Sequence, residues 1–454
     1  MKIIIAGDGK VGSLLTKQLS LDGHELVVID RNDDALESTI ERYDVMSIQG
    51  NCASMSVLKS AGIQKSDLLI AATGEDEVNL LTCMTAKYMN PRIHTIARVR
   101  TPEYMETTDK MKREFALSLA VNPELQTAHE IGSLMRYPAF LMREEFANGL
   151  VEIVALKIDK NSLICDKSLI EVRDIVRCQI LVCAVTRGTE TFTPRGDFVL
   201  REGDRIYVTA SASNLSLLLH HLKIINRKIR NVVLLGGGRI AYYLTNKLQR
   251  EHISVKIIER DRERCERLAD RLPNTTIVQG DVSLQSVLER ECIDQADAVV
   301  SMTGMDELNV ITSLYANSKN VKKVVTKLGR GENQALIENL PVGGVVCPKE
   351  LCGNTILRYV RAMKDGEGAA VTIHSIAGGQ AQAYEFIVDH MTPYCEIPLK
   401  DVPFKKNILI TSITRNRVIE IPGGDSFYQP GDRIVVVSSS ATPIKNIEDI
   451  YVRV

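Results

Sequence analysis

The stretch Lys2-Ile3-Ile4-Ile5-Ala6-Gly7-Asp8-Gly9-Lys10-Val11-Gly12 decides the fold of the N-terminal part of this chain. A short apolar run typical of a strand leads into three glycines spaced GxGxxG, and an amphipathic stretch over residues 11–21 predicts a helix. In this fingerprint the first glycine permits a tight turn, the second lets a pyrophosphate approach the backbone, and the third lets helix and strand pack closely. Alone, the pattern is weak evidence, because glycine turns also connect strands to helices for structural reasons.

The same order of features recurs about half a chain later. The apolar run over 231–235 leads into Gly236-Gly237-Gly238-Arg239-Ile240-Ala241, at an offset of 229 residues from the first glycine turn. Asp30 ends the next apolar strand of the first half, and Glu259 does so in the second at the same offset. The stretches over 73–79 and 303–309 also match, at an offset of 230. The chain is therefore an internal duplication.

Each half is predicted to contain two lobes. Short apolar strands alternate with amphipathic helical stretches, which indicates βαβ units and a parallel sheet. β-rich runs follow, separated by turn signals such as Glu202-Gly203-Asp204 and Pro430-Gly431-Asp432. We therefore expect an α/β fold with two tandem Rossmann-like domains, each followed by a small α+β domain, over residues 1–124, 143–227, 232–348 and 368–453. Residues 223–230 read as a short basic linker.

Composition excludes several classes of protein. Apolar residues make up 44% and charged residues 25% of the 454 residues, as in compact globular proteins. The 56 basic and 57 acidic side chains nearly cancel, so no global field favours nucleic acid. No run of roughly 18 apolar residues is long enough to cross a bilayer, and the N-terminus lacks the layout of a signal peptide, so we expect a cytoplasmic protein. The ten cysteines show no zinc-type spacing, so we expect no metal site.

The acidic residues after the glycine turns predict the ligand. Asp30 lies 23 residues after Gly7, and Glu259 lies 23 residues after Gly236. A carboxylate at this spacing binds the ribose hydroxyls and repels a 2′-phosphate, which favours NAD over NADP. Arg98 follows a β-rich run, as a lysine does in the second half, where a cation can face the phosphates at the carboxyl edge of the sheet. A solvated surface cation is the alternative.

Catalytic groups are harder to find. Tyr315 and Lys319 have the spacing YxxxK, but the counterpart of the tyrosine in the first half is Thr85, so it is not part of the repeated design. None of the eight histidines shares a repeated position, and the chain has no GxxxxGK[ST], GxSxG or HExxH motif. We expect no catalytic residue and no enzyme. An NAD-dependent oxidoreductase and a nucleotide or redox sensor acting on a soluble partner remain the alternatives.

A wider set of matches resembles a known family. Gly7-x-Gly9-x-x-Gly12, Ile29-Asp30-Arg31, Gly50-Asn51, Ala72-Thr73-Gly74 and Arg98, followed by a lobe ending Glu202-Gly203-Asp204-Arg205-Ile206, resemble an RCK (KTN) domain with its C-terminal companion. Two such units in tandem resemble the TrkA family, the regulatory subunits of bacterial Trk potassium uptake systems. The resemblance implies RCK-N domains at 1–124 and 232–348 and RCK-C domains at 143–227 and 368–453.

The same resemblance implies a function. A homotetrameric ring of RCK domains would lie in the cytoplasm, peripheral on the inner face of the cell membrane, beneath a membrane-embedded Trk-type potassium-translocating subunit. Ligand-driven change in the ring would gate potassium uptake. NAD(H) is the implied ligand, with ATP or ADP as further ligands, and nucleic acid is not an expected partner.

The resemblance also implies residue roles. The three glycines of the first turn would carry the pyrophosphate, Asp30 the adenosine ribose, Asn51 the adenine edge, and Thr73 and Arg98 the phosphate or nicotinamide side. Asn51 stands where the family often has Asp, as the second half does. The full expected cofactor-binding set is Gly7, Asp8, Gly9, Lys10, Val11, Gly12, Asp30, Arg31, Asn51, Cys52, Thr73, Gly74, Glu77, Arg98, Gly236, Gly238, Arg239, Ala241, Glu259, Asp281, Thr303 and Lys327.

Overall fold

The computed structural model describes most of the chain, namely residues 1–110, 114–188, 190–224, 228–329, 337, 340–363, 370–439, 444 and 446–452, without the side chains of 109, 148 and 378. The predicted domain ends at 227, 368 and 453 lie outside these residues. The chain divides into two units, Met1–Ala128 with Cys347–Lys364, and His129–Val346 with Asp365–Val454. Among the described residues, no helix is both long and apolar enough to cross a membrane.

The first Rossmann lobe is a six-stranded parallel sheet in the order β3-β2-β1-β4-β5-β6. The strand order reverses beside β1, and in such sheets ligands bind at the carboxyl ends of the strands at this point. The strands are β1 (Lys2–Ala6), β2 (Glu25–Asp30), β3 (Met46–Gln49), β4 (Leu68–Ala71), β5 (His94–Arg98) and β6 (Leu119–Val121). The helices are α1 (Lys10–Leu21), α2 (Asp33–Ile40), α3 (Met55–Ser60), α4 (Asp76–Met89), α5 (Pro102–Lys110) and α6 (Pro123–Arg136).

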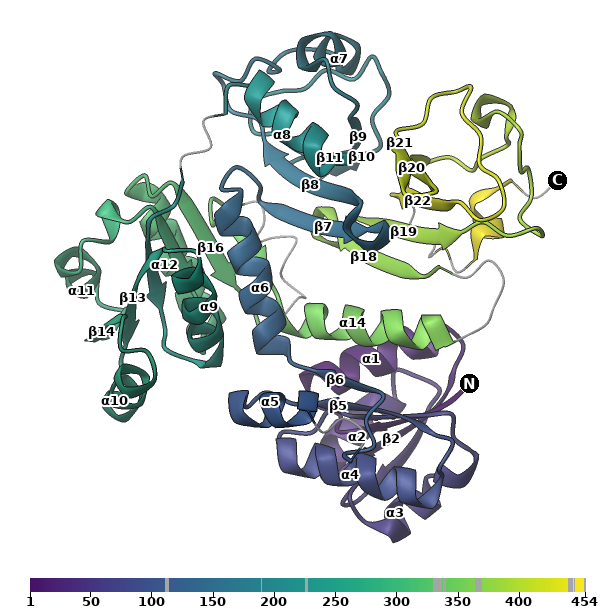
Figure 1. The fold of residues 1–454 in the computed structure, drawn as a ribbon, viewed down its shortest axis with the longest axis vertical. Helices are drawn as coiled ribbons and strands as arrows, with labels where there is room; N and C mark the ends of the chain where they lie inside the picture. The colour runs from purple at the N-terminus through teal and green to yellow at the C-terminus, as the bar shows by residue number, and fades with distance from the viewer. Residues whose placement is uncertain are drawn as a thin grey trace. The chain divides into compact units, whose positions relative to one another are not determined.

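Helices cover both faces of this sheet because its strands are apolar on both sides. Ile4 and Ala6 of β1 pack in one cluster with residues of α3 and α4, whereas Ile3 and Ile5 pack on the other face with residues of α1 and α14 (Pro348–Met363). Helix α14 follows the second Rossmann sheet in sequence, yet it lies along α1 in the first (Figure 1). The first lobe is therefore completed by a helix from the other half of the chain.

The second Rossmann lobe repeats the first, with the sheet order β14-β13-β12-β15-β16-β17. The end of α6 packs on α9 of this lobe: Arg136 pairs with Glu251 at 2.9 Å, and a Cβ at Gly132 would lie 2.3 Å from Lys247. The exchange of helices is thus reciprocal. The elements are β12 (Asn231–Leu235), α9 (Arg239–Arg250), β13 (Ser254–Glu259), α10 (Arg262–Arg271), β14 (Thr276–Gln279), α11 (Gln285–Arg290), β15 (Ala298–Ser301), α12 (Asp306–Ser318), β16 (Lys323–Lys327) and β17 (Gly344–Val346).

Each small lobe is a five-stranded antiparallel sheet, in the orders β10-β9-β11-β8-β7 and β18-β19-β22-β20-β21. The elements are β7 (Met142–Phe146), β8 (Val151–Lys157), α7 (Leu169–Val176), β9 (Leu181–Arg187), β10 (Glu190–Phe192), β11 (Arg205–Ser211), α8 (Ala212–His221), β18 (Thr372–Ile376), β19 (Ala381–Ile387), β20 (Ile408–Arg415), β21 (Val418–Glu420) and β22 (Arg433–Ser438). The predicted α/β fold, with two Rossmann-like lobes each followed by a small lobe, is confirmed.

The repeated Gly-Asp-Arg turns of the small lobes have a structural role. Asp204 is fully buried and accepts two hydrogen bonds from Arg187, at 2.8 and 2.7 Å. Asp432 makes the matching pair with Arg415, at 3.0 and 2.8 Å. A buried carboxylate needs such a bidentate partner. These turns therefore join strands within each lobe and do not present a free charge to a ligand.

Candidate nucleotide sites

The glycine turn of the first half has the geometry that its spacing predicts. Gly7 has a φ of +101°, which side chains with a Cβ rarely adopt. A Cβ at Gly12 would lie 1.8 Å from the Gly7 carbonyl oxygen, so α1 can approach β1 only with glycine there. Gly9 precedes the first turn of α1, and a Cβ there would meet nothing within 4 Å. The second glycine therefore faces open space, as a pyrophosphate would require.

Two carboxyl groups lie beside this turn. Asp30 ends β2 and accepts hydrogen bonds from the Asp8 amide at 2.6 Å and the Asn32 amide at 2.9 Å. Asp8 is 7% exposed and accepts a hydrogen bond from Thr39 at 2.6 Å. Burial raises the pKa of the Asp8 carboxyl, the Thr39 hydrogen bond opposes that rise, and the charge of Asp30 adds to it. The two carboxyl groups give this end of the site an acidic character.

A cavity of about 420 Å³ opens at the carboxyl edge of the first sheet. This volume lies within the range of roughly 300 to 1,000 Å³ that is usual for ligand sites. Its lining includes nine residues of the expected set, Gly7, Gly9, Lys10, Asp30, Arg31, Cys52, Thr73, Gly74 and Arg98, together with Ile29, Gly50, Ala72, Glu75 and Val78. The structure therefore brings the glycine turn, the β2 carboxylate and the β5 cation together around one space.

Arg98 closes the far end of the cavity. Its guanidinium donates a hydrogen bond to the Thr73 carbonyl at 2.6 Å, and its Nε is buried without a hydrogen bond partner among the described residues. None of the described carboxylates forms an ion pair with Arg98, and burial, followed by the nearby charge of Arg100, lowers its pKa. A cation desolvated in this way favours an anionic ligand.

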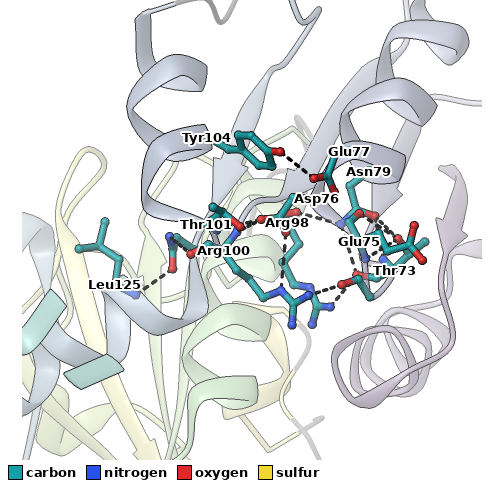
Figure 2. A network of polar contacts seen from close by, with 12 residues as sticks. Thr73, Glu75, Asp76, Glu77, Asn79, Arg98, Arg100, Thr101, Tyr104 and Leu125 are labelled. Carbon is teal, nitrogen blue, oxygen red and sulfur yellow. Dashed lines mark hydrogen bonds and ion pairs between the residues drawn. The ribbon is translucent and has the colours of Figure 1, made fainter. Parts of the chain in front are cut away.

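Asn79 connects Thr73 to Arg98 (Figure 2). The Thr73 amide and hydroxyl both donate to the Asn79 side-chain oxygen, at 2.8 and 2.7 Å. The Asn79 side-chain amide in turn donates to the Arg98 carbonyl at 2.9 Å. Because Asn79 is fully buried, these bonds place the β4–α4 loop and the end of β5 in a defined relation. Asn79 is a positioning residue that the sequence reasoning did not assign to the site.

The acidic residues at the start of α4 accept hydrogen bonds from other parts of the first Rossmann lobe. Asp76 accepts hydrogen bonds from the Arg100 and Thr101 amides, at 3.0 and 2.8 Å (Figure 2). Burial alone would raise the pKa of Asp76, but these amides and the Arg100 charge lower it overall. Glu77, one of the expected site residues, accepts a hydrogen bond from Tyr104 at 2.7 Å. It does not line the cavity.

The second half repeats this arrangement with other side chains. Gly236 has a φ of +105°, and a Cβ at Gly238 would meet nothing within 4 Å. Thr303 donates through its amide and hydroxyl to Asn309, both at 2.7 Å, and Asn309 donates to the Lys327 carbonyl at 3.0 Å. Since the Asn79 and Asn309 positions match in sequence as well, their repetition was the signal that could have identified both.

The remaining expected residues lie around the two glycine turns. Asp8, Val11, Gly12 and Asn51 are not among the residues that line the first cavity. Asn51 accepts a hydrogen bond from the Ala53 amide at 3.1 Å, which leaves its side-chain NH₂ available. In the second half, Arg239 begins α9 and is exposed, Ala241 is buried, and Asp281 accepts a hydrogen bond from the Ser283 amide at 2.9 Å.

Comparison with known proteins gives the family. Residues 3–123 and 232–348 match the TrkA-N domain, and residues 153–223 match the TrkA-C domain. The chain belongs to the TrkA family. Among TrkA proteins, the Trk system potassium uptake protein TrkA homolog 1 of Methanosarcina mazei is 31% identical over 97% of this chain and 98% of its own length. The Trk system potassium uptake protein TrkA of Halomonas elongata is 28% identical over 99% and 98% of the two chains. The predicted family is confirmed.

Solved structures share the fold of this TrkA family member. The crystal structure of the GsuK RCK domain has a TM-score of 0.61 at 17% identity, over 97% of this chain and 92% of that chain. The GsuK channel bound to NAD has a TM-score of 0.59 at 18% identity, over 97% and 77% of the two chains. The tandem arrangement of Rossmann and small lobes is therefore one that RCK domains adopt.

Proposed function

We propose that this chain is the nucleotide-binding regulatory subunit of a Trk-type potassium uptake system. Two relatives that match this chain over nearly their whole length are named as Trk system potassium uptake proteins. We propose NAD(H) as the ligand of both glycine turns, with ATP or ADP as further ligands. In the first half, the glycine turn would bind the pyrophosphate, Asp30 the adenosine ribose, and Arg98 the phosphate or nicotinamide side. The full set of expected site residues stands as part of this proposal.

The observation that carries the proposal is the desolvated Arg98 across one cavity from the Gly9 backbone. A phosphate would supply the direct ion pair that none of the described carboxylates makes with Arg98. The amides at the start of α1 would bind the same ligand through the positive end of the helix dipole. A dinucleotide requires three contacts, namely a cation, a glycine whose backbone the pyrophosphate can approach, and a carboxylate that binds the ribose.

A regulatory role fits these residues better than catalysis. Tyr315 donates a hydrogen bond to Glu289 at 3.2 Å and lies nine residues into α12 from Asp306. At a rise of about 1.5 Å per residue, its backbone is roughly 13 Å along the helix from the sheet edge where nucleotides bind. Burial raises the pKa of the Cys52 thiol, which disfavours the reactive thiolate in the first cavity. We propose that the protein is not an enzyme.

The proposed mechanism is a shift in the shape of an assembly. We propose a homotetrameric ring on the cytoplasmic face of the membrane, bound to a membrane-embedded potassium-translocating subunit. A nucleotide that binds one ring shape better than another shifts the population by its differential affinity, typically about 1 to 3 kcal/mol per coupled site. Several sites in a ring add their effects. No covalent chemistry is needed to move the gate.

Calorimetric titration with NADH tests the site. We expect Asp30→Ala to weaken binding at the first site by roughly tenfold or more, because it removes a charge-assisted bond to the ribose. Asp33→Ala is the matched control, since Asp33 is an exposed carboxylate of α2 that does not line the cavity. Equal affinity of Asp30→Ala and Asp33→Ala would remove Asp30 from the site.

Reconstitution with a Trk-type membrane subunit tests the function. Potassium flux into vesicles should change when NADH, ATP or ADP is added. The part of this change in flux that depends on the first site should disappear in the Asp30→Ala protein. Flux that does not respond to this chain or to nucleotides would contradict the regulatory role. Turnover of NADH with a panel of small molecules would instead favour an oxidoreductase.

A further inference from the structure

The two glycine turns differ in charge where the adenosine ribose would lie. Four equivalent positions form what we term the ribose end of each site. The first ribose end consists of Asp8, Asp30, Arg31 and Ala35, and the second consists of Gly237, Glu259, Arg260 and Arg264. The first therefore holds two carboxyl groups and one guanidinium, whereas the second holds one carboxylate and two guanidiniums.

In the first ribose end, the structure describes hydrogen bonds but no ion pair to the key carboxylate, and Arg31 is the one cation among the four positions. Asp30 accepts hydrogen bonds from two backbone amides, and none of the described side chains forms an ion pair with it. Asp8 adds a second carboxyl group, and one of its oxygens is buried with no hydrogen bond partner among the described residues. A phosphate brought to this end would meet negative charge from both groups, which opposes binding.

In the second ribose end, the carboxylate is already satisfied within the protein. Glu259 accepts hydrogen bonds from the Gly237 amide at 2.8 Å, the Asp261 amide at 2.9 Å and the Arg264 guanidinium at 3.2 Å. Glu259 is only 7% exposed, whereas the side chain of Arg264 is 47% exposed. The groups that this end presents to a ligand are therefore the guanidinium of Arg264 and that of Arg260, whose side chain is 79% exposed and lies 4.0 Å from the Asp281 carboxylate.

Glycine stands in the second ribose end where the first has Asp8. A Cβ at Gly237 would lie 2.6 Å from Leu268 and 3.1 Å from the Cβ of Glu259. A side chain there would have to displace the Leu268 side chain, so glycine at this position lets α10 pack closely against Glu259.

We propose that the second site accepts an adenine dinucleotide with a phosphate on the adenosine ribose, as in NADPH, and that the first site excludes it. The inference rests on the proposed nucleotide-binding function. Arg264 is the specificity residue, because a guanidinium binds phosphate oxygens through paired hydrogen bonds and keeps its charge at any physiological pH. The acidic residue at the end of β13 does not enforce the usual preference for NAD, since Arg264 neutralises it.

The test separates the two sites in the full-length chain. A methyl group at Gly9 or Gly238 meets no protein atom, and both residues have φ near −73°, so Gly9→Ala and Gly238→Ala should fold normally and each block one site. Calorimetric titrations with NADH and NADPH then measure the remaining site. We expect the Gly238→Ala protein to bind NADH alone, and the Gly9→Ala protein to bind NADPH at least as tightly as NADH.

Substitutions at Arg264, Asp8 and Ala35 test which residues decide between NADH and NADPH. In the Gly9→Ala background, Arg264→Ala should weaken NADPH binding by on the order of tenfold to a hundredfold, with a smaller effect on NADH. In the Gly238→Ala background, the double substitution Asp8→Gly and Ala35→Arg should give the first site NADPH binding. A gain of binding cannot result from misfolding.

The outcomes distinguish this inference from the function on which it rests. If the Gly9→Ala protein binds NADH but discriminates against NADPH as strongly as the Gly238→Ala protein does, the inference is wrong and nucleotide binding stands. If the unsubstituted chain binds neither dinucleotide, the proposed function fails first.

Discussion

At Gly12 a single methyl group decides whether the first helix can pack on the first strand. A Cβ at this position would lie 1.8 Å from the carbonyl oxygen of Gly7, a backbone atom that cannot move aside. At Gly9, three residues earlier, a methyl group meets no protein atom within 4 Å. Of the two glycines of this motif, Gly12 is needed for packing, and we propose that Gly9 gives a ligand access to the backbone.

We expect Gly12→Ala to lower the free energy of unfolding by about 3 kcal/mol, the upper range for overpacking a close contact. Urea denaturation followed by circular dichroism measures this change. Gly9→Ala is the matched control and should unfold like the unsubstituted chain while its first site fails to bind NADH. Equal stability of both alanine variants would contradict the packing role of Gly12.

Asp8 should make stability depend on pH. Burial raises the pKa of Asp8 above its ordinary value of 3.8, so the folded state favours the protonated carboxyl. The chain thus loses stability as pH rises from about 4 through the folded-state pKa. We expect Asp8→Asn to be more stable than the unsubstituted chain at pH 8, because the amide has no charge to keep buried.

The pH dependence of this difference in stability tests its cause. The advantage of Asp8→Asn should shrink as pH falls through the folded-state pKa and vanish below about 4, where both the carboxyl and the amide are neutral. Urea titrations without nucleotide at several pH values measure it, with Asp33→Asn on the exposed face of α2 as control. An advantage that stays constant across the pH range would rule out the titration of Asp8 as its cause.

At the scale of elements, α14 is bound to α1 by close packing and one ion pair. A Cβ at Gly353 would lie 2.7 Å from the Leu14 side chain, and Arg361 pairs with Asp22 at 3.1 Å. The buried side of α14 contributes Cys352, Ile356, Leu357 and Val360 to the core beneath the first sheet. The helix is therefore an integral layer of the first Rossmann lobe.

Gly353→Leu should displace this helix. A leucine side chain would overlap Leu14, and overpacking of this kind typically costs about 1 to 3 kcal/mol. Hydrogen exchange should become faster over residues 348–363 and over α1, and urea denaturation should report the loss. Arg358→Leu, at an exposed position of the same helix, is the control and should leave exchange in α1 unchanged. Faster exchange in both variants would argue against a specific contact at Gly353.

At the scale of the whole molecule, neither half of the chain contains a complete Rossmann lobe. Helix α14 completes the first, and the end of α6 packs on the second. A fragment of residues 1–224 lacks α14 and with it the apolar side chains that this helix adds to the core of the first lobe, Cys352, Ile356, Leu357 and Val360. Each buried aliphatic side chain contributes about 1.5 to 3 kcal/mol, and a domain has only about 5 to 15 kcal/mol in total.

We therefore expect the 1–224 fragment to self-associate and to melt at a lower temperature than the full chain. Light scattering after size exclusion and a thermal melt measure both properties. Addition of a peptide of residues 347–363 should restore part of the lost stability. A monomeric fragment with an unchanged melting temperature would mean that α14 is dispensable.

Much of the architecture could be predicted from local patterns. The apolar runs over 2–6 and 231–235 are strands, and the helix after the first glycine turn begins one residue before the predicted 11. Alternation of apolar runs and glycine turns is a local property, so it survives without knowledge of the fold. The edge strands β7, β10, β18 and β21 were not predicted, because edge strands are short and less apolar.

The sequence by itself determined the duplication, the Rossmann order and the identity of the glycine, carboxylate and cation positions, since these depend on spacing along the chain. Only the tertiary structure decided that Glu77 accepts a hydrogen bond from Tyr104 and that Asn79 and Asn309 position the loops after β4 and β15. Only the tertiary structure decided that α14 completes the first lobe. The tertiary structure also decided that Glu259 pairs with Arg264, whereas none of the described side chains forms an ion pair with Asp30. Such facts depend on which groups meet across distant segments, and contact between distant segments leaves no periodic signal in a single sequence.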